Sequence, residues 1–200
     1  MELSQCELPT QYGLVKCYAF RLAPGCPENL ALVWRRPGDR SHPIVRIHSE
    51  CLTGDVIGSY RCDCGSQFAL SMAMLAAAPH AILIYLRGHE GRGIGLLNKI
   101  RAYHRQQVLG EDTVDANVGL GLPVDARSYD DAVAFLRQLS VSAVTILTNN
   151  PDKISVLRSA GIRVIRRIPL AVPATSDSKR YIAAKVSRLG HLIDAEDVSL

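Results

Sequence analysis

The hydrophobic pattern of this chain changes at the segment RCDCG, residues 61–65, and this change limits the possible folds more than any other feature. Before it, the sequence predicts three strands, at 13–22, 28–36 and 42–50, separated by loops rich in Pro and Gly. After it, segments typical of helices alternate with segments typical of buried strands. This order favours an α+β fold, in which helices pack on a mixed, largely antiparallel sheet, over a sandwich or a helix bundle.

The part of the chain after residue 65 is expected to supply the helices. The pattern predicts helices at 67–78, 96–109, 130–139, 151–160 and 180–193, and strands at 81–86, 143–147 and 162–169. Asn150 followed by Pro151 is typical of a helix cap and the first helical residue. Because no clear linker or repeat interrupts the chain, we expect residues 1–200 to form a single domain.

The composition argues against nucleic acid and membranes as partners. The net charge is only +4, from 23 Lys and Arg against 19 Asp and Glu, and no lysine-rich block occurs, so an anionic small molecule is the expected ligand. No window approaches the roughly eighteen apolar residues of a membrane helix, and the N-terminus lacks the apolar core of a signal peptide. We therefore expect a cytoplasmic protein, whose thiols stay reduced.

Three closely spaced cysteines, Cys51, Cys62 and Cys64, predict a metal site. A C-x-C pair does not easily close a disulfide, but its two thiolates can converge on one soft cation together with a third thiolate. Zinc with three protein ligands and a fourth position open to water is typical of a catalytic centre. The spacing leaves two alternatives open: a structural site closed by His48, and cysteines that are only packed in the core.

Several polar segments could bind an anionic ligand. The turn GHEGRGIG is neither a dinucleotide fingerprint nor a P-loop, but it follows a strand and opens a helix, so its amides and Arg92 could hold phosphate, unless it serves only as a turn. In a strand, Arg46, His48 and Glu50 would share one face. Arg46 suits phosphate and Glu50 suits a guanine-like N–H edge, although either residue could equally be solvated.

Two further segments have a functional and a plainer interpretation. Asp125 and Arg127 could share a ligand as an acid–base carboxylate and a phosphate-binding guanidinium, although a simple salt bridge is commoner. Lys153 opposes the dipole of its helix in the first turn, a mild cost that an anionic ligand could offset. Thr148 ends the preceding strand, where ligands tend to bind in α/β folds.

Six ordered segments resemble the GTP cyclohydrolase II family across nearly the entire chain: RIHSECLTGD, RCDCGSQ, EGRGIGLLNKIRAY, DTVDAN, LTNNPDK and KVSRLGHL. The resemblance implies an enzyme that uses a zinc-bound water to open the imidazole ring of GTP at C8. It would release formate and pyrophosphate and leave 2,5-diamino-6-(5-phosphoribosylamino)pyrimidin-4(3H)-one, a precursor of riboflavin. It also implies a need for magnesium and assembly as a homodimer.

The resemblance also assigns roles to residues. It makes Cys51, Cys62 and Cys64 the zinc ligands. It implies nucleotide contacts at Arg46, Ile47, His48, Ser49, Glu50, Gln67, Glu90, Gly91, Arg92, Thr113, Thr148 and Lys153. It makes Asp125 a proton acceptor, Arg127 the group acting at the α-phosphate and Tyr103 a further active-site residue. A protonated guanidinium, with a pKa above about 12, is a poor nucleophile, so we favour Arg127 as an electrostatic clamp.

One departure from the family pattern is Gly88 and His89 before the EGR segment, where some members have a shorter R-Q-E-G-R. This loop could place an imidazole near the triphosphate. No extra domain for the neighbouring riboflavin step is present in the 200 residues, so we expect a monofunctional enzyme. Two other functions stay open: a paralogue that stops at a formamidopyrimidine or uses another purine nucleotide, and a non-catalytic module that binds zinc or nucleotide.

Overall fold

The computed structural model describes residues 1–193, which divide into two compact units. Unit 1 comprises Met1–His48, Phe68–Arg87 and Ser128–Leu170. Unit 2 comprises Ser49–Gln67, Gly88–Arg127 and the residues from Ala171 onward. The expectation of a single domain over residues 1–200 stays a prediction.

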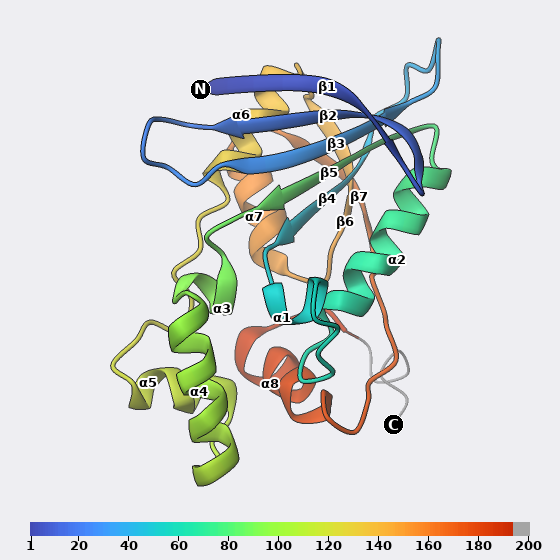
Figure 1. The fold of residues 1–200 in the computed structure, drawn as a ribbon. Helices are drawn as coiled ribbons and strands as arrows, with labels where there is room; N and C mark the ends of the chain where they lie inside the picture. Colours follow the sequence, from blue (N-terminus) through green and yellow to red (C-terminus); the bar gives the residue numbers. More distant parts are fainter. Residues whose placement is uncertain (194–200) are drawn as a thin grey trace. The chain divides into compact units, whose positions relative to one another are not determined.

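Unit 1 is built on a seven-stranded mixed sheet (Figure 1). Its strands are β1 (Glu2–Thr10), β2 (Gly13–Arg21), β3 (Asn29–Arg35), β4 (Ile44–Ser49), β5 (His80–Leu86), β6 (Ala143–Leu147) and β7 (Arg163–Ile168), and the last residue of β4 begins unit 2. The order is β1-β2-β3-β5-β4-β6-β7. Pairing is antiparallel from β1 through β2 and β3 to β5, and parallel from β4 through β6 to β7. The predicted mixed, largely antiparallel sheet is therefore confirmed.

Helices α6 (Asp130–Gln138) and α7 (Pro151–Ser159) pack on one face of this sheet. Their apolar side chains join those of the strands in one buried cluster, in which the ring of Phe135 stacks on Phe20 with centroids 4.6 Å apart. Asn150 caps α7 as predicted, because its side chain accepts a hydrogen bond from the Asp152 amide at 2.8 Å. The cap fixes where the chain turns from β6 into the helix.

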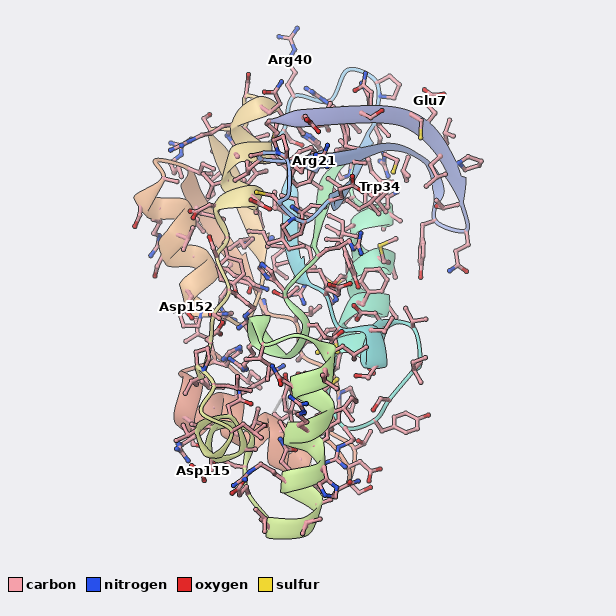
Figure 2. All side chains as sticks on the ribbon, turned by 60° about the vertical axis from the view of Figure 1, so that its left-hand side comes forward. Glu7, Arg21, Trp34, Arg40, Asp115 and Asp152 are labelled. Atoms are coloured by element: carbon pink, nitrogen blue, oxygen red, sulfur yellow. The ribbon has the colours of Figure 1, made fainter. Side chains whose placement is uncertain are left out.

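Helix α2 (Cys64–Ala77) covers the opposite face with its later turns. Met72 and Leu75 pack there against Val15 and Trp34 from the strands (Figure 2). Because alternate residues of a strand point to opposite faces, β2 contributes side chains to the buried apolar clusters on both faces of the sheet. The central strand β5 is buried on both faces and is apolar from Ala81 to Leu86, whereas its neighbour β4 carries the buried polar residues Arg46 and His48.

Unit 2 is helical. Its helices are α1 (Leu52–Asp55), α3 (Glu90–Gly93), α4 (Leu96–Leu109), α5 (Thr113–Gly119) and α8 (Lys179–Leu189), and it also holds the first residues of α2. Helix α4 packs against α3 and α5, and α5 packs against α8. No helix among residues 1–193 has both the length and the apolar run needed to cross a membrane.

Four elements were not predicted from the sequence, namely β1, α5 and the four-residue helices α1 and α3, and one element was predicted too long. β1 is exposed along almost its whole length, so it lacks the alternation that marks a half-buried strand. α5 has only seven residues, too few for a clear period. The predicted C-terminal helix at 180–193 ends early, because Gly190 adopts φ +60° and the His191 amide donates to the Lys185 carbonyl at 3.0 Å.

Candidate metal centre and active-site cavity

Three cysteines converge within unit 2. Cys51 precedes α1, whereas Cys62 and Cys64 lie where the chain enters α2. The three sulfur atoms lie within 4.8 Å of one another, with 3.6 Å between those of Cys51 and Cys62. No His, Asp or Glu of residues 1–193 adds a fourth ligand atom to the group. Such a sulfur donor set can hold a soft metal ion such as zinc.

Two glycines allow the cysteine-bearing turns to approach each other. A Cβ built on Gly65 would lie 2.2 Å from the carbonyl oxygen of Gly54, far inside contact distance. A Cβ on Gly54 would lie 3.1 Å from both the Cys51 sulfur and the Cys64 Cβ. Glycine at positions 54 and 65 therefore lets the two turns come close enough for the sulfur atoms to converge.

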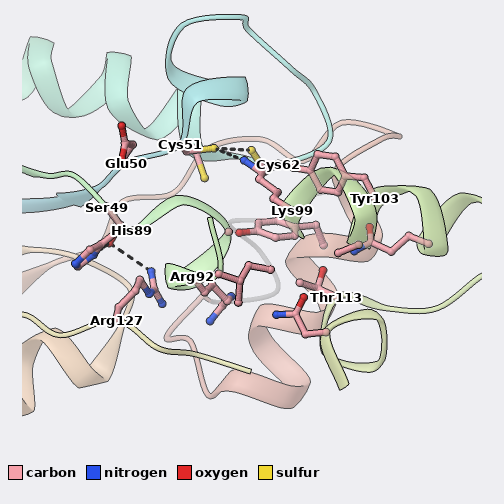
Figure 3. A pocket seen from close by; sticks show the side chains of 17 residues that line it. Ser49, Glu50, Cys51, Cys62, His89, Arg92, Lys99, Tyr103, Thr113 and Arg127 are labelled. Atoms are coloured by element: carbon pink, nitrogen blue, oxygen red, sulfur yellow. Dashed lines mark hydrogen bonds between the residues drawn. The ribbon is translucent and has the colours of Figure 1, made fainter. Parts of the chain in front are cut away.

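Lys99, on α4, places an ammonium group against this cluster (Figure 3). Its Nζ lies 3.1 Å from the Cys51 sulfur, 2.8 Å from Thr53 Oγ1 and 2.5 Å from Glu90 Oε1. Burial is the largest single influence on the pKa of Lys99 and would lower it. The negative charge at Cys51 and the hydrogen bonds to Glu90 and Cys51, with further contributions, together outweigh burial, so the net pKa is raised and Lys99 stays charged. The sequence analysis missed this residue, since lysine in an otherwise amphipathic helix is ordinarily solvated.

The negative charge of the cluster is concentrated on one sulfur. Hydrogen bonds from Cys62 and Cys64, assisted by Lys99, hold the pKa of Cys51 well below its usual range. Hydrogen bonding to Cys51 raises the pKa of Cys62 to about 11 and also raises that of Cys64. Cys51 is therefore the thiolate that a cation would meet first.

Glu90 joins this network from the EGRG turn. Its Oε1 pairs with Lys99, and its Oε2 accepts the backbone N–H of Leu52 at 2.6 Å, so both oxygens hold the cysteine-bearing turn in place. Gly91 and Arg92 follow with φ of +59° and +66°. A non-glycine residue in this left-handed region is strained, and such strain is common where a side chain must be aimed at a ligand.

A carboxylate between two guanidinium groups forms a second cluster in unit 2. Asp125 lies 3.1 Å from Arg92 NH1 and 2.5 Å from Arg127 NH2, and it also accepts the Arg127 backbone N–H and Nε–H at 3.1 and 2.9 Å. Burial alone would raise the pKa of Asp125. The hydrogen bonds and charge of Arg127, together with the charge of Arg92, have a larger opposite effect, so the net pKa is lowered. The predicted salt bridge between Asp125 and Arg127 is present.

The Gly88–His89 departure from the family pattern lies in this region. His89 Nδ1 is 3.1 Å from the hydroxyl oxygen of Ser49, which also accepts a bond from Arg127 NH1 at 3.4 Å (Figure 3). Glu50 accepts the Gly88 backbone N–H at 2.8 Å. The loop thus brings an imidazole within reach of Arg127 through Ser49.

One cavity of unit 2 is lined by the three cysteines and by the two arginines of the second cluster. It is lined by Ser49, Glu50, Cys51, Cys62, Cys64, His89, Gly91, Arg92, Ile94, Lys99, Ala102, Tyr103, Gln106, Thr113, Asn117, Arg127 and Tyr181. The Nε of Arg92 and the Nε2 of Gln106 are buried donors without a hydrogen-bond partner in the described part of the chain. A ligand that brings several acceptor oxygens or nitrogens would satisfy them.

Tyr103 lies in this cavity next to positive charge. The guanidinium of Arg61 is 4.6 Å from its ring centroid, and the Lys99 ammonium is 5.5 Å away. Burial raises the pKa of Tyr103 to about 12, despite the opposing effect of Lys99. Its phenol is therefore protonated at neutral pH and can donate a hydrogen bond.

Five of the other predicted nucleotide contacts, Arg46, Ile47, His48, Thr148 and Lys153, lie in unit 1, whereas Gln67 lies in unit 2 and donates to Asp63 at 2.7 Å. Arg46 donates to the Leu147 carbonyl at 3.2 Å and Lys153 to the Ile47 carbonyl at 2.8 Å. The Lys153 Nζ also lies 5.3 Å from the centroid of the Tyr129 ring. The expectation that Arg46, His48 and Glu50 share one strand face is wrong in part, because β4 ends at Ser49 and Glu50 lies beyond it.

His48 and Thr148 also have defined neighbours in unit 1. The ring of His48 lies 4.9 Å from that of Phe68 and 5.3 Å from that of Tyr85. Thr148 accepts the Asn150 backbone N–H at 3.1 Å through its hydroxyl. His48 therefore packs among aromatic side chains of unit 1.

Several known proteins are similar to this chain in sequence. The sequence model of the family described as GTP cyclohydrolase II matches residues 2–169. The GTP cyclohydrolase-2 of Neisseria meningitidis serogroup A is 48% identical over 96% of this chain and 95% of its own length. The probable bifunctional riboflavin biosynthesis protein RIBA 2 of Oryza sativa is 47% identical over 94% of this chain, and the monofunctional riboflavin biosynthesis protein RIBA 3 of Arabidopsis thaliana is 45% identical over 92%.

The relatives differ in length. This chain spans 34% of the rice protein and 36% of the Arabidopsis protein, so it corresponds to about a third of each. Among solved structures, the two-domain 3,4-dihydroxy-2-butanone 4-phosphate synthase RibBX of A. baumannii covers 84% of this chain and 39% of its own. Its sequence identity of 18% and TM-score of 0.42 are too low to carry an argument.

Proposed function

We propose, from the premise that this chain belongs to the GTP cyclohydrolase II family, that the protein opens the imidazole ring of GTP at C8. The products would be formate, pyrophosphate and 2,5-diamino-6-(5-phosphoribosylamino)pyrimidin-4(3H)-one, the first step toward riboflavin. The observation that carries this proposal is the cavity of unit 2, in which a three-sulfur cluster and the guanidinium groups of Arg92 and Arg127 line one space.

Zinc is the metal that we assign to Cys51, Cys62 and Cys64. Three sulfur donors without a fourth ligand atom from the described residues fit a catalytic zinc better than a closed structural one. Zinc in this position would supply Lewis-acid activation of water at neutral pH. Lys99 and Glu90 would keep the Cys51 turn in place, since both contact it directly or through Leu52.

The remaining roles follow from charge and protonation. Arg92 and Arg127 would bind triphosphate oxygens and stabilise the charge that develops as pyrophosphate leaves, with magnesium as a further counter-charge. Asp125 is the proposed proton acceptor; it would become available as phosphate oxygens draw the two arginines away from it. Tyr103, protonated at neutral pH, would orient water or the base by donating a hydrogen bond.

The nucleotide contacts are proposed in both units. In unit 2 they are Ser49, Glu50, Gln67, Glu90, Gly91, Arg92 and Thr113. In unit 1 they are Arg46, Ile47, His48, Thr148 and Lys153. Since both oxygens of Glu90 contact Lys99 and Leu52, we expect the nucleotide to approach Glu90 only if one of these bonds is exchanged.

We further propose a homodimer, a cytoplasmic location, no nucleic-acid or membrane partner, and a single domain with one enzymatic activity. The homodimer rests on family resemblance, and light scattering after size-exclusion chromatography would test it. The location rests on the six free cysteines, because a reducing compartment keeps thiols available to metal.

Product analysis tests the function. Purified protein would be loaded with zinc and incubated with GTP and Mg²⁺, and formate, pyrophosphate and the pyrimidine would be measured by mass spectrometry. We expect all three in equal amounts. A product that retains the formyl group would favour the paralogue that stops early, and bound zinc without turnover of GTP or other purine nucleotides would favour the non-catalytic module.

A further inference from the structure

A buried ion pair connects the C-terminal helix of unit 2 to the cysteine cluster. Lys185, on α8, places its Nζ 2.5 Å from Oδ1 of Asp63, and the two side chains are only 8% and 3% exposed. Asp63 is the residue between Cys62 and Cys64. Its other oxygen accepts a hydrogen bond from Gln67 Nε2 at 2.7 Å. Both oxygens of this carboxylate are thus held, one from α8 and one from α2.

The pair is poorly explained as a source of stability alone. Taking two charges out of water costs several kcal/mol each, and apolar side chains of similar size often stabilise a core equally well. The position of Asp63 offers a better explanation. Because its backbone joins two of the three sulfur-bearing residues, fixing its side chain also fixes the direction in which Cys62 and Cys64 point.

Helix α8 is itself anchored next to the cavity. Tyr181, one turn before Lys185, lines the cavity, and its ring centroid is 4.8 Å from the Lys185 Nζ. At the N-terminal end, the hydroxyl of Thr175 donates to the Tyr60 carbonyl at 3.4 Å, in the loop that leads to Cys62. At the other end, the Lys185 carbonyl accepts the His191 amide as part of the helix cap. The family model matches residues 2–169, and the segment KVSRLGHL, which begins at Lys185 on this helix, also resembles the family in sequence.

We propose that Lys185 is a positioning residue of the metal centre, which holds the Cys62–Asp63–Cys64 turn in its metal-binding geometry through Asp63. The proposal rests on the function proposed above, in that the three cysteines bind zinc. It makes α8 part of the site: the helix supplies a wall through Tyr181 and holds two ligands through Lys185. Loss of the Lys185 ammonium would leave the Asp63 carboxylate buried without its cation and would release the turn.

Zinc retention in Lys185→Met tests the proposal, because methionine keeps the chain length and removes the charge. Arg188→Met is the matched control: Arg188 lies on the same helix, 43% exposed, and pairs with Asp112 and Asp115 rather than with the cysteine turn. Zinc-loaded proteins would be mixed with a coloured chelator and the rate and extent of zinc release measured. Cobalt-loaded proteins would report the ligand geometry through their sulfur-to-cobalt absorption band.

We expect Lys185→Met to bind zinc roughly 10–100-fold more weakly than wild type and to shift or weaken the cobalt band, as loss of an outer-shell partner typically does. Arg188→Met should match wild type in both measurements. Wild-type protein that retains no zinc would refute the proposed function. Wild-type protein with one zinc per chain and a Lys185→Met variant that retains it equally well would refute the role of Lys185 alone.

A double variant keeps the test valid if Lys185→Met does not fold. Asp63→Asn/Lys185→Met removes both charges, so no unpaired buried charge remains to unfold the protein. If the pair only balances charge, this variant should release zinc at the wild-type rate, and that result would overturn the proposal. If Lys185 positions the turn, zinc release should be faster than in wild type, although circular dichroism shows a folded protein.

Discussion

Arg127 is the residue for which the contacts distinguish two chemical roles. Its backbone N–H and two side-chain nitrogens contact Asp125, and its NH1 contacts Ser49. A guanidinium held against a carboxylate keeps its proton and has no free electron pair for attack. The contacts therefore support the electrostatic clamp over the nucleophile at the α-phosphate.

Substitution of Arg127 tests this at the level of the single residue. We expect Arg127→Met to lower kcat/KM for GTP by about 10²–10³-fold, as removal of one stabilising donor does in other enzymes. Arg127→Lys should recover part of that loss, because a positive charge remains. Rapid quenching followed by intact-mass measurement should show no protein carrying a guanylyl group. A guanylyl adduct on Arg127 of wild-type protein would refute the clamp.

Residues with unusual spacing were predictable from the sequence, whereas residues defined by their partners were not. The spacing of Cys51 and the C-x-C pair alone predicts a cluster of cysteines, and the structure confirms that the three sulfur atoms converge. Lys99 and Lys185 look like ordinary helix lysines until the fold buries each against an acidic residue. Asp63 is distant from Lys185 in the sequence, and Glu90 lies across a turn from Lys99, so neither pairing follows from the periodicity of a helix.

At the scale of elements, the approach of α1 to the first turn of α2 decides whether the cluster can form. Gly65→Ala places a Cβ where the Gly54 carbonyl lies, so one backbone segment must move. We expect a loss of about 1–3 kcal/mol in the free energy of unfolding and much weaker zinc binding. Urea denaturation and chelator competition would measure the two effects.

Ser66→Ala is the control for that substitution. Ser66 is the next residue of α2, and its side chain is exposed. Replacing it with the smaller alanine should therefore leave zinc binding unchanged. If Gly65→Ala binds zinc as tightly as Ser66→Ala, the close approach of Gly54 and Gly65 is not needed for the cluster.

The elements themselves were predictable wherever burial imposes a period. Strands β2 to β7 and helices α2, α4, α6 and α7 all lie where the apolar pattern places them. β1 was not predicted because it is an edge strand, paired with β2 and exposed on both faces. Its sequence therefore lacks the alternation of apolar and polar residues that marks a half-buried strand. Its existence depends on backbone pairing, which the sequence pattern does not report.

At the scale of the whole molecule, no feature of the sequence indicates that the chain divides into two units. Each unit is assembled from three separate segments, so the division follows no linker and no shift in composition. A change in composition can mark a domain boundary only when each domain is one continuous stretch of the sequence. The predicted nucleotide contacts fall in both units for the same reason, since neighbouring residues such as His48 and Ser49 belong to different ones.

The pH dependence of stability offers a test that involves the whole chain. Burial, followed by the charges of Lys185, Arg92 and Arg127, lowers the pKa of His191 to about 3, against an ordinary value of 6.5. The folded protein therefore keeps this imidazole neutral, whereas the unfolded chain takes up a proton below pH 6.5. His191 thus contributes stability that is present above pH 6.5 and is lost as the pH falls toward 3.

Replacing His191 should remove that part of the pH dependence. One proton changes the free energy of unfolding by at most about 1.4 kcal/mol per pH unit. Between pH 7.5 and 5.5, wild type should therefore lose about 1 kcal/mol more than His191→Gln, measured by urea denaturation of the zinc-loaded proteins. The exposed His104→Gln serves as the control for loss of an imidazole. An equal loss in wild type and His191→Gln would mean that the folded and unfolded proteins take up a proton at His191 equally readily, and would contradict the lowered pKa.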